Sequence, residues 1–258
     1  MAVILEGGCR VSDMREGEPV VSGTVRIWDQ IGQATGAQAI SLRVLEFAPG
    51  LSPGIRNADS DEILYVLGDG YVNDARENTI WIDDAEFNVG GDTGIYIRPQ
   101  QTFAIDNPNS QPVLVISSRC PDPDRAQEFV DRTVTSHSRS NAKNPFVHLW
   151  DRAPQSTADR WYRVLVDNEV GSKQVTQFVG SIPPGRAPDH FHNYEEVLFI
   201  LKGEGRMWAG QTNTPISVGS CIYLPNGQSH CVENTGDGEL RLLGVFYPAG
   251  SPSVRYEA

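Results

Sequence analysis

The chain is long enough for one large domain or two of ordinary size, and it is strongly acidic. It has 258 residues, with 21 Lys and Arg against 33 Asp and Glu, and a formal net charge of −12 at pH 7. An acidic chain repels phosphate backbones, so nucleic-acid binding is not expected. The opening MAVILEGGCR has no positive start and no signal-peptide core, and no later run approaches the length of a membrane span. These features predict a cytoplasmic protein that does not bind membranes.

Short β-rich runs, separated by glycine and proline, fill the first half of the chain. They are ISLRVLEF (40–47), EILYVLG (62–68), TGIYIRP (93–99) and PVLVISS (112–118). Short, evenly spaced strands with turn signals are typical of an all-β sandwich or barrel. One segment differs: PDRAQEFVDRTV (123–134) has a helical pattern, and Pro123 stands where proline favours the start of a helix.

A polar segment follows, and the β-rich pattern then returns. Residues 135–145 (TSHSRSNAKNP) lack apolar periodicity, which predicts a linker. The later runs are KQVTQFVGSI (173–182), EVLFIL (196–201), SCIYLP (220–225) and LRLLGVFYP (240–248). The four cysteines of the chain form no CxxC pair, which favours reduced thiols over a disulfide scaffold.

The two halves resemble each other. EILYVLGDGYV (62–72) is similar to EVLFILKGEGRM (196–207), and GIYIRPQQTFAIDN (94–107) is similar to CIYLPNGQSHCVEN (221–234). An internal repeat of this size predicts two copies of one β-domain. The expected units are an N-terminal domain (1–134) that ends in a short helix, the linker (135–145) and a C-terminal domain (146–258).

Three histidines and a carboxylate in the second half form a candidate metal site. His190 and His192 are two apart, so on an extended strand both side chains point to one face. Glu196 follows after a short turn, and His230 comes just after a Pro-x-Gly turn. Imidazole nitrogens and a carboxylate oxygen suit a divalent transition metal. The other two histidines, His137 and His148, are interpreted as ordinary polar residues near the linker.

The segments GRAPDHFHNYEEVLFILKG (185–203) and GSCIYLPNGQSHCVEN (219–234) resemble the two signature motifs of the cupin superfamily. The first is one residue shorter than the usual form between its opening glycine and His190. With the internal repeat, the resemblance implies a bicupin, which is two jelly-roll-like barrels of the double-stranded β-helix type in tandem. It further implies one iron, manganese, nickel or zinc ion in the C-terminal barrel, held by His190, His192, Glu196 and His230.

The N-terminal half departs from this pattern. Arg56 and Ala58 stand opposite the first two histidines, Ala104 or a neighbour stands opposite His230, and only Glu62 is retained. One carboxylate cannot hold a transition metal well, so this barrel is expected to lack metal and to serve as a packing or dimer surface. The alternative is that Arg56 binds an anionic ligand.

Barrel mouths make good small-molecule sites, and a metal there can polarise a carbonyl or activate water. The leading hypothesis is a metal-dependent enzyme that acts on a small oxygen-rich or carboxylated metabolite, with dioxygenase chemistry. The alternatives are a metal-dependent isomerase, lyase or hydrolase, and a non-catalytic small-molecule-binding or structural cupin. Gln177, Trp208 and Tyr223 are candidate substrate contacts. A homodimer is expected by analogy only.

Overall fold

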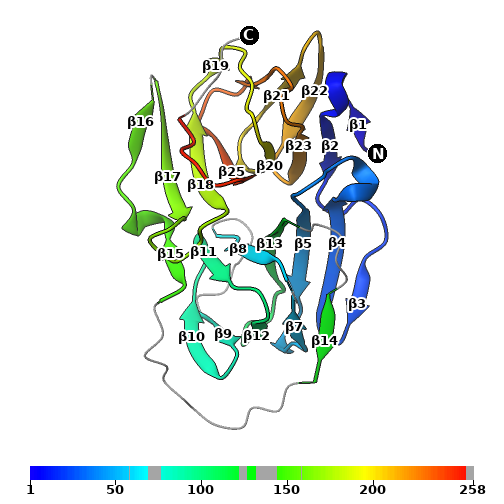
Figure 1. Ribbon diagram of the computed structural model, residues 1–258, viewed down its shortest axis with the longest axis vertical. Helices are drawn as coiled ribbons and strands as arrows, with labels where there is room; N and C mark the ends of the chain where they lie inside the picture. The colour runs from blue at the N-terminus through cyan, green and yellow to red at the C-terminus, as the bar shows by residue number, and fades with distance from the viewer. Residues whose placement is uncertain (58, 69–76, 122–126, 132–143, 158, 254–258) are drawn as a thin grey trace.

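The computed structural model describes residues 1–57, 59–68, 77–121, 127–131, 144–157 and 159–253. Almost all regular structure is β-strand, in four sheets that form two barrels, one above the other in Figure 1. The described residues also include three short 3-10 helices: η1 (Glu6–Gly8), η2 (Gln33–Thr35) and η3 (Leu149–Asp151). The all-β, two-barrel architecture expected from the sequence is confirmed.

The upper barrel in Figure 1 consists of an eight-stranded and a four-stranded sheet. The first has the order β1 (Val3–Ile4), β2 (Arg10–Asp13), β23 (Ser220–Leu224), β20 (Glu195–Lys202), β25 (Leu240–Tyr247), β18 (Thr176–Ile182), β17 (Arg160–Val166) and β16 (Gln155–Thr157). The second has the order β19 (Gly185–Arg186), β24 (His230–Asn234), β21 (Glu204–Ala209) and β22 (Thr212–Ser217).

The lower barrel has the same two-sheet plan. Its seven-stranded sheet has the order β15 (Phe146–His148), β11 (Thr93–Ile97), β8 (Asp61–Val66), β13 (Val113–Cys120), β5 (Leu42–Phe47), β4 (Val25–Ile31) and β3 (Val20–Ser22). Its other sheet has the order β10 (Ala85–Val89), β9 (Asn78–Ile82), β12 (Thr102–Asn107), β7 (Gly54–Arg56) and β14 (Glu128–Val130), and β6 (Gly50–Leu51) also pairs with β12.

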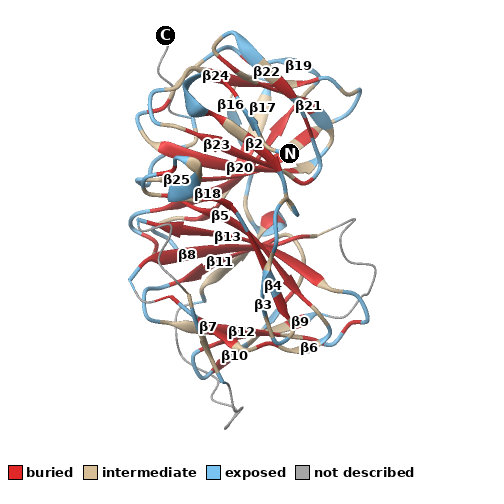
Figure 2. Cartoon of the chain, turned by 90° about the vertical axis from the view of Figure 1, so that its right-hand side faces the viewer, coloured by how far each residue is buried: buried red, intermediate tan, exposed pale blue. Residues whose placement is uncertain are grey.

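The two largest sheets lie face to face at the junction of the barrels, where Figure 2 shows buried strands on both sides. One apolar cluster spans this junction and includes Tyr65 from the lower barrel and Phe199 and Tyr223 from the upper barrel. Strand β20 shows the consequence for side-chain direction. Val197 and Phe199 belong to the junction cluster, whereas Leu198 and Ile200 belong to the core inside the upper barrel.

Burial on both faces explains the sequence pattern of these strands. A strand with one solvated face alternates between apolar and polar residues, whereas a strand covered on both faces has a continuous apolar run. All six residues of β8 are buried, as are all eight residues of β13. These runs therefore predict strands well, but they do not show which residues face the barrel interior.

The boundary between the two halves of the chain is not the boundary between the barrels. Strand β2, from the start of the chain, pairs with β23 of the upper barrel. Strand β15, which follows the expected linker, pairs with β11 of the lower barrel. The domains expected at 1–134 and 146–258 therefore each give a strand to the sheet of the other barrel. Local sequence patterns carry no signal for such long-range pairing.

The short helix expected at 123–134 is not present where the structure describes that segment. Residues Glu128–Val130 form strand β14, which pairs with Gly54–Arg56 of β7. The open edge of β7 provides hydrogen-bond partners that outweigh a weak local helical pattern. The remainder of that prediction, and the linker except for residues 144 and 145, lie outside the described residues.

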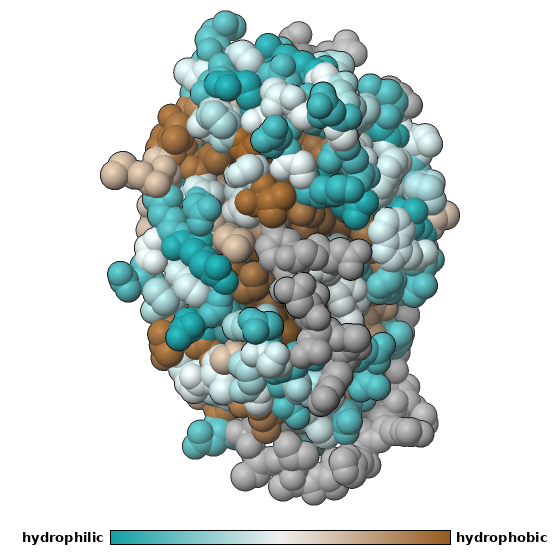
Figure 3. All heavy atoms as spheres, turned by 180° about the vertical axis from the view of Figure 1, so that it is seen from behind, coloured by the Kyte–Doolittle hydropathy of each residue, from teal (hydrophilic) through white to brown (hydrophobic). Residues whose placement is uncertain are grey.

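The exposed surface is mainly hydrophilic, with apolar side chains in separate patches, as the face in Figure 3 shows. Exposed apolar residues include Val3 and Ile4 on β1 and Val20 and Val21 on β3, which are edge strands of the two large sheets. Across the described part of the chain, no helix is long and apolar enough to cross a membrane. The homodimer stays a prediction.

Candidate metal site

Backbone pairing brings the first and last of the predicted histidine ligands together. His190 and His230 form an isolated antiparallel bridge, in which each backbone N–H donates to the other's carbonyl at 3.1 and 2.8 Å. The Pro225-x-Gly227 turn holds His192, because the Gly227 N–H donates to the His192 carbonyl at 2.8 Å. Gly227 has a φ of +76°, a conformation that favours glycine.

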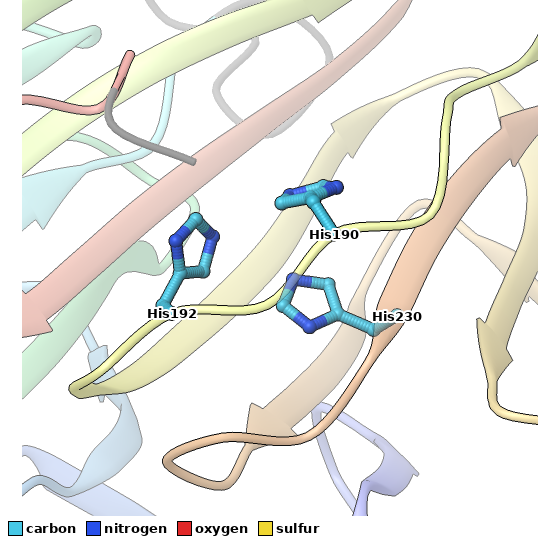
Figure 4. Close-up of side chains that lie close together, drawn as sticks. All are labelled: His190, His192 and His230. Atoms are coloured by element: carbon cyan, nitrogen blue, oxygen red, sulfur yellow. The ribbon is translucent and has the colours of Figure 1, made fainter. Parts of the chain in front are cut away.

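The three imidazoles lie close together in space (Figure 4). One potential ligand atom from each of His190, His192 and His230 lies within 4.8 Å of the others. The ring centroids are 4.6 to 5.2 Å apart. Three imidazole nitrogens this close could hold one divalent transition-metal ion.

Hydrogen bonds on the far side of two rings orient them for this role. Nδ1 of His190 lies 3.0 Å from the Pro188 carbonyl oxygen, and Nδ1 of His230 lies 2.8 Å from the Gln228 carbonyl oxygen. A carbonyl can only accept, so the proton of each neutral ring is on Nδ1 and the lone pair is on Nε2. Burial, together with the charge of nearby His190, lowers the pKa of His230 to about 4. His230 is therefore neutral at pH 7, as a ligand must be.

Glu196 borders the three-histidine cluster from strand β20. Its Oε2 lies 3.6 Å from His192 Nε2, and the residue is only 5% exposed. Burial raises the pKa of this carboxyl to about 8. A buried carboxylate is unfavourable without a cation beside it. The donor set therefore fits a divalent metal, and direct ligation by Glu196 stays a prediction.

A cavity of about 110 Å³ opens beside this cluster. All four predicted ligands line it, and most of the remaining walls are apolar: Trp161, Tyr162, Phe178, Ile182, Ala187, Leu198, Val232, Leu242 and Pro252. Ser181 of β18 also lines it, as do two polar residues from β16 and β17, Thr157 and Arg160. Sequence reasoning missed both, because they precede the histidine motif by about thirty residues and no local pattern marks them.

The three candidate substrate contacts do not line this cavity, which corrects the expectation. Gln177 points to the lower barrel, where its Nε2 donates to the Leu64 carbonyl at 3.2 Å. Tyr223 also faces the junction, and its hydroxyl donates to Glu195 Oε1 at 2.5 Å. The strands of both residues are buried on both faces, so the sequence does not show which of their side chains face the barrel interior.

Trp208, the third candidate, lies outside the upper barrel's interior on β21. Its indole N–H donates to Glu233 Oε2 at 2.8 Å, and the Arg186 guanidinium lies 4.0 Å from its ring. Its sheet neighbours Met207 and Ala209 are the residues that contribute to the barrel core. Trp208 therefore packs with Arg186 and Glu233 on the face of β21 that points away from the barrel core.

The lower barrel has two arginines beside Glu62, the residue that the repeat aligns with Glu196. Glu62 is fully buried and accepts from Arg43 Nη2 at 2.5 Å and from Ser117 Oγ at 2.7 Å. A second guanidinium, of Arg119, lies 3.8 Å from Glu62 Oε2. Within the described residues, the three-histidine group is the only cluster suited to a metal.

The internal repeat places Arg56 and Ala58 opposite the first two histidines. The pair Arg43 and Arg119 lies outside the repeated motifs, so the repeat did not predict it. Arg56 is exposed at the end of β7, which gives no support to its proposed role as an anion-binding residue inside the barrel. Ala58 lies outside the described residues. Ala104 is fully buried on β12 and offers no ligand atom.

Comparisons with known proteins agree with this architecture. Residues 178–246 match the family model described as Cupin domain. Auxin-binding protein 1 of Arabidopsis thaliana is 34% identical over 86 residues, which cover 30% of this chain and 43% of the relative. The oxalate-binding protein of Thermotoga maritima is 38% identical over 67 residues, covering 25% of this chain and 55% of the relative. The chain thus spans about half the length of these curated relatives.

Solved structures match over almost the whole chain. A mutant of Bacillus subtilis oxalate decarboxylase with residues 162–163 deleted aligns with a TM-score of 0.73 at 12% identity, covering 92% of this chain and 76% of that one. The formate complex of Lactobacillus farciminis oxalate decarboxylase aligns with a TM-score of 0.73 at 12% identity, covering 93% and 87%. Residues 178–246 therefore match a cupin domain, and the chain as a whole has the two-barrel fold of these solved structures.

Proposed function

We propose that the upper barrel binds one divalent transition-metal ion and acts on a small, oxygen-rich or carboxylated metabolite in the adjoining cavity. The observation that carries this proposal is the convergence of His190, His192 and His230, with their ligand atoms within 4.8 Å of one another, at the wall of a cavity. Glu196 supplies a nearby carboxylate. The names of the relatives, an oxalate-binding protein and oxalate decarboxylases, support a carboxylate ligand.

Different residues of the chain would hold the metal, place a carboxylate beside it and exclude water from the cavity. His190 and His230 present Nε2 because backbone carbonyls hold their Nδ1 protons. Glu196 places a carboxylate oxygen beside His192, where it can offset positive charge or hold a proton at Oε2. The apolar walls exclude water and strengthen every electrostatic contact inside the cavity. When bound, a transition metal would supply Lewis acidity and, if redox-active, electron transfer.

Two reaction classes fit this arrangement. Dioxygenase chemistry needs a redox metal with free positions, and three or four protein ligands leave such positions on an octahedral ion. Lyase chemistry, such as loss of a carboxyl group, needs a Lewis acid and a group that moves a proton. The names of the structural neighbours, which are oxalate decarboxylases, favour the second class. We propose both reaction classes, and the products of the reaction distinguish them.

The first test is elemental analysis of protein purified without a nickel column or chelator. About one metal ion per chain is expected in the wild type, with most of it lost in His192→Ala and retained in His148→Ala, because His148 lies away from the cavity on β15. Circular dichroism should show that His192→Ala keeps its β-structure. Failure of the wild type to take up manganese, iron, nickel or zinc would overturn the metal site.

The second test screens small carboxylates, including oxalate and 2-oxo acids, with the metal-loaded protein. Oxygen consumption that stops under nitrogen would support dioxygenase chemistry. Release of carbon dioxide under nitrogen would support lyase chemistry. Tight binding of a carboxylate without turnover of any member of the panel would refute both enzymatic proposals and favour the non-catalytic alternative.

A further inference from the structure

The rings of the three predicted histidine ligands are oriented by different kinds of contact. Backbone carbonyl oxygens lie at Nδ1 of His190 and of His230. The ring of His192 stacks on the ring of Tyr194, with centroids 4.7 Å apart and planes only 9° from parallel. A contact between two flat faces depends on the tilt of the rings, so it holds the plane in which the His192 imidazole lies.

Tyr194 also connects this imidazole to the core of the upper barrel. Its ring stacks on that of Phe246, with centroids 4.6 Å apart and an interplanar angle of 20°. Phe246 is fully buried in the core cluster, and its backbone pairs with Glu196, the fourth predicted ligand. Because Phe246 lies on a paired strand, its ring gives Tyr194 a firm support. The contacts of Tyr194 therefore link His192 to the strand pair that carries Glu196.

The contact of Tyr194 with the metal site runs through the His192 ring. Tyr194 is midway in sequence between His192 and Glu196, whose side chains lie 3.6 Å apart. It is not among the described residues that line the cavity, so it is not placed to touch a ligand there. A side chain that is already ordered need not be immobilised when its partner binds, which preserves affinity. A stacked His192 ring is preorganised in this sense.

We infer that Tyr194 is a positioning residue of the metal site. Its ring sets the plane of the His192 imidazole, so that the His192 ligand nitrogen lies close to those of His190 and His230 before the metal binds. This inference rests on the proposed function and adds to it a residue that acts on the metal through one of the ligands.

Cobalt(II) binding to the full-length, metal-free protein tests this role. Cobalt lies between iron and nickel in divalent-metal affinity, and its visible spectrum depends on the number and geometry of its ligands. Tyr194→Ala removes the flat face beside His192. It should weaken cobalt binding, measured by competition with a chelator, by about two- to tenfold, the range for ordering one more side chain. It should also change the cobalt spectrum. Tyr194→Phe keeps the stack and should match the wild type in both measurements.

Two further variants separate positioning from a general loss of stability. Tyr194→Leu fills most of the space but has no flat face, so it should fold and still weaken cobalt binding. Phe87→Leu is the matched control, because Phe87 and Phe146 make a ring contact in the lower barrel with centroids 4.7 Å apart. This control should lower Tm and leave cobalt affinity and the cobalt spectrum unchanged.

Wild-type affinity and a wild-type spectrum in both Tyr194→Ala and Tyr194→Leu would overturn the inference and leave the metal site standing. An equal loss of affinity in Phe87→Leu would also overturn it, because the loss would then follow from reduced stability alone. A wild type that takes up neither cobalt nor manganese, iron, nickel or zinc would overturn the proposed function itself, and the inference with it.

Discussion

Glu62 and Glu196 occupy equivalent places in the internal repeat but have opposite electrostatic surroundings, and replacing each with glutamine tests this difference. Glu62 is fully buried beside two guanidinium groups, with Arg43 Nη2 at 2.5 Å. Glu196 is 5% exposed, and its Oε2 lies 3.6 Å from His192 Nε2. The first glutamate is a counter-ion to the two arginines, whereas the second is a candidate metal ligand.

The two substitutions should therefore have unequal effects on the metal-free protein. Glu62→Gln leaves the arginine charges of the lower barrel without their buried partner, which costs about 3–5 kcal/mol. At roughly 2–4 °C per kcal/mol, Tm falls by about 6–20 °C. Glu196→Gln replaces a carboxyl whose pKa burial raises to about 8, and which is therefore mostly protonated at pH 7. Its Tm should stay within about 4 °C of the wild type, equivalent to ~1 kcal/mol.

Thermal unfolding at pH 7, followed by circular dichroism after chelation, measures both effects. The pH dependence adds a second readout. The folded state binds the Glu196 proton more tightly than the unfolded state, so this group's contribution to stability falls as pH rises from 4.5 to about 8. Glu196→Gln should lack that part of the decline. Equal Tm values for Glu62→Gln and the wild type would refute the role assigned to the arginine pair.

Other predictions address the cavity, the junction and the metal. In Gly244→Ala, the new Cβ would lie 2.3 Å from the Phe178 ring, so the ring must move; ligand affinity, measured by calorimetry, should change while metal content does not. Glu195→Gln should lower the free energy of unfolding in urea by about 1–3 kcal/mol, because the Glu195 carboxylate accepts from the N–H groups of Gln38 and Ala39 at 2.8 and 2.7 Å; an unchanged value would contradict this. Removing the metal with a chelator should lower Tm and leave the β-sheet circular dichroism intact. Restored metal should stabilise the protein by about 3–4 kcal/mol at 100 to 1,000 times its Kd. Loss of the β-sheet spectrum on chelation would show that the metal is needed for folding.

Much of the fold was predictable because its signals are local. Strands covered on both faces have long apolar runs. All six residues of β8 are buried, and so are the first six of the eight residues of β20. His190 and His192 could be paired with His230 because a two-residue spacing and a Pro-x-Gly turn each constrain the backbone over a few residues. Their convergence in space then required only that the flanking strands share a barrel.

The rest depended on contacts between distant parts of the chain. Arg160 reaches the cavity through pairing of β17 with β18, which no feature near residue 160 indicates. Tyr223 was expected at the site, but its strand is apolar on both faces, so the sequence could not show that it faces the junction. Arg43 and Arg119 replace a metal-binding group with charges from strands outside the aligned motifs.

The exchange of strands between the two halves also affects the order in which the protein can be assembled during synthesis. Residues Arg10–Asp13 of β2 are synthesised well before their partner β23, which begins at Ser220. The same is true of Glu6, whose backbone N–H donates at 2.8 Å to the hydroxyl of Thr212, 206 residues away. Because pairing over such a separation is slow and waits for residues that are synthesised later, β2 stays without its partner until β23 has been made. Nascent chains halted before residue 220 should therefore leave the N-terminal strands open to proteases, whereas the finished protein protects them.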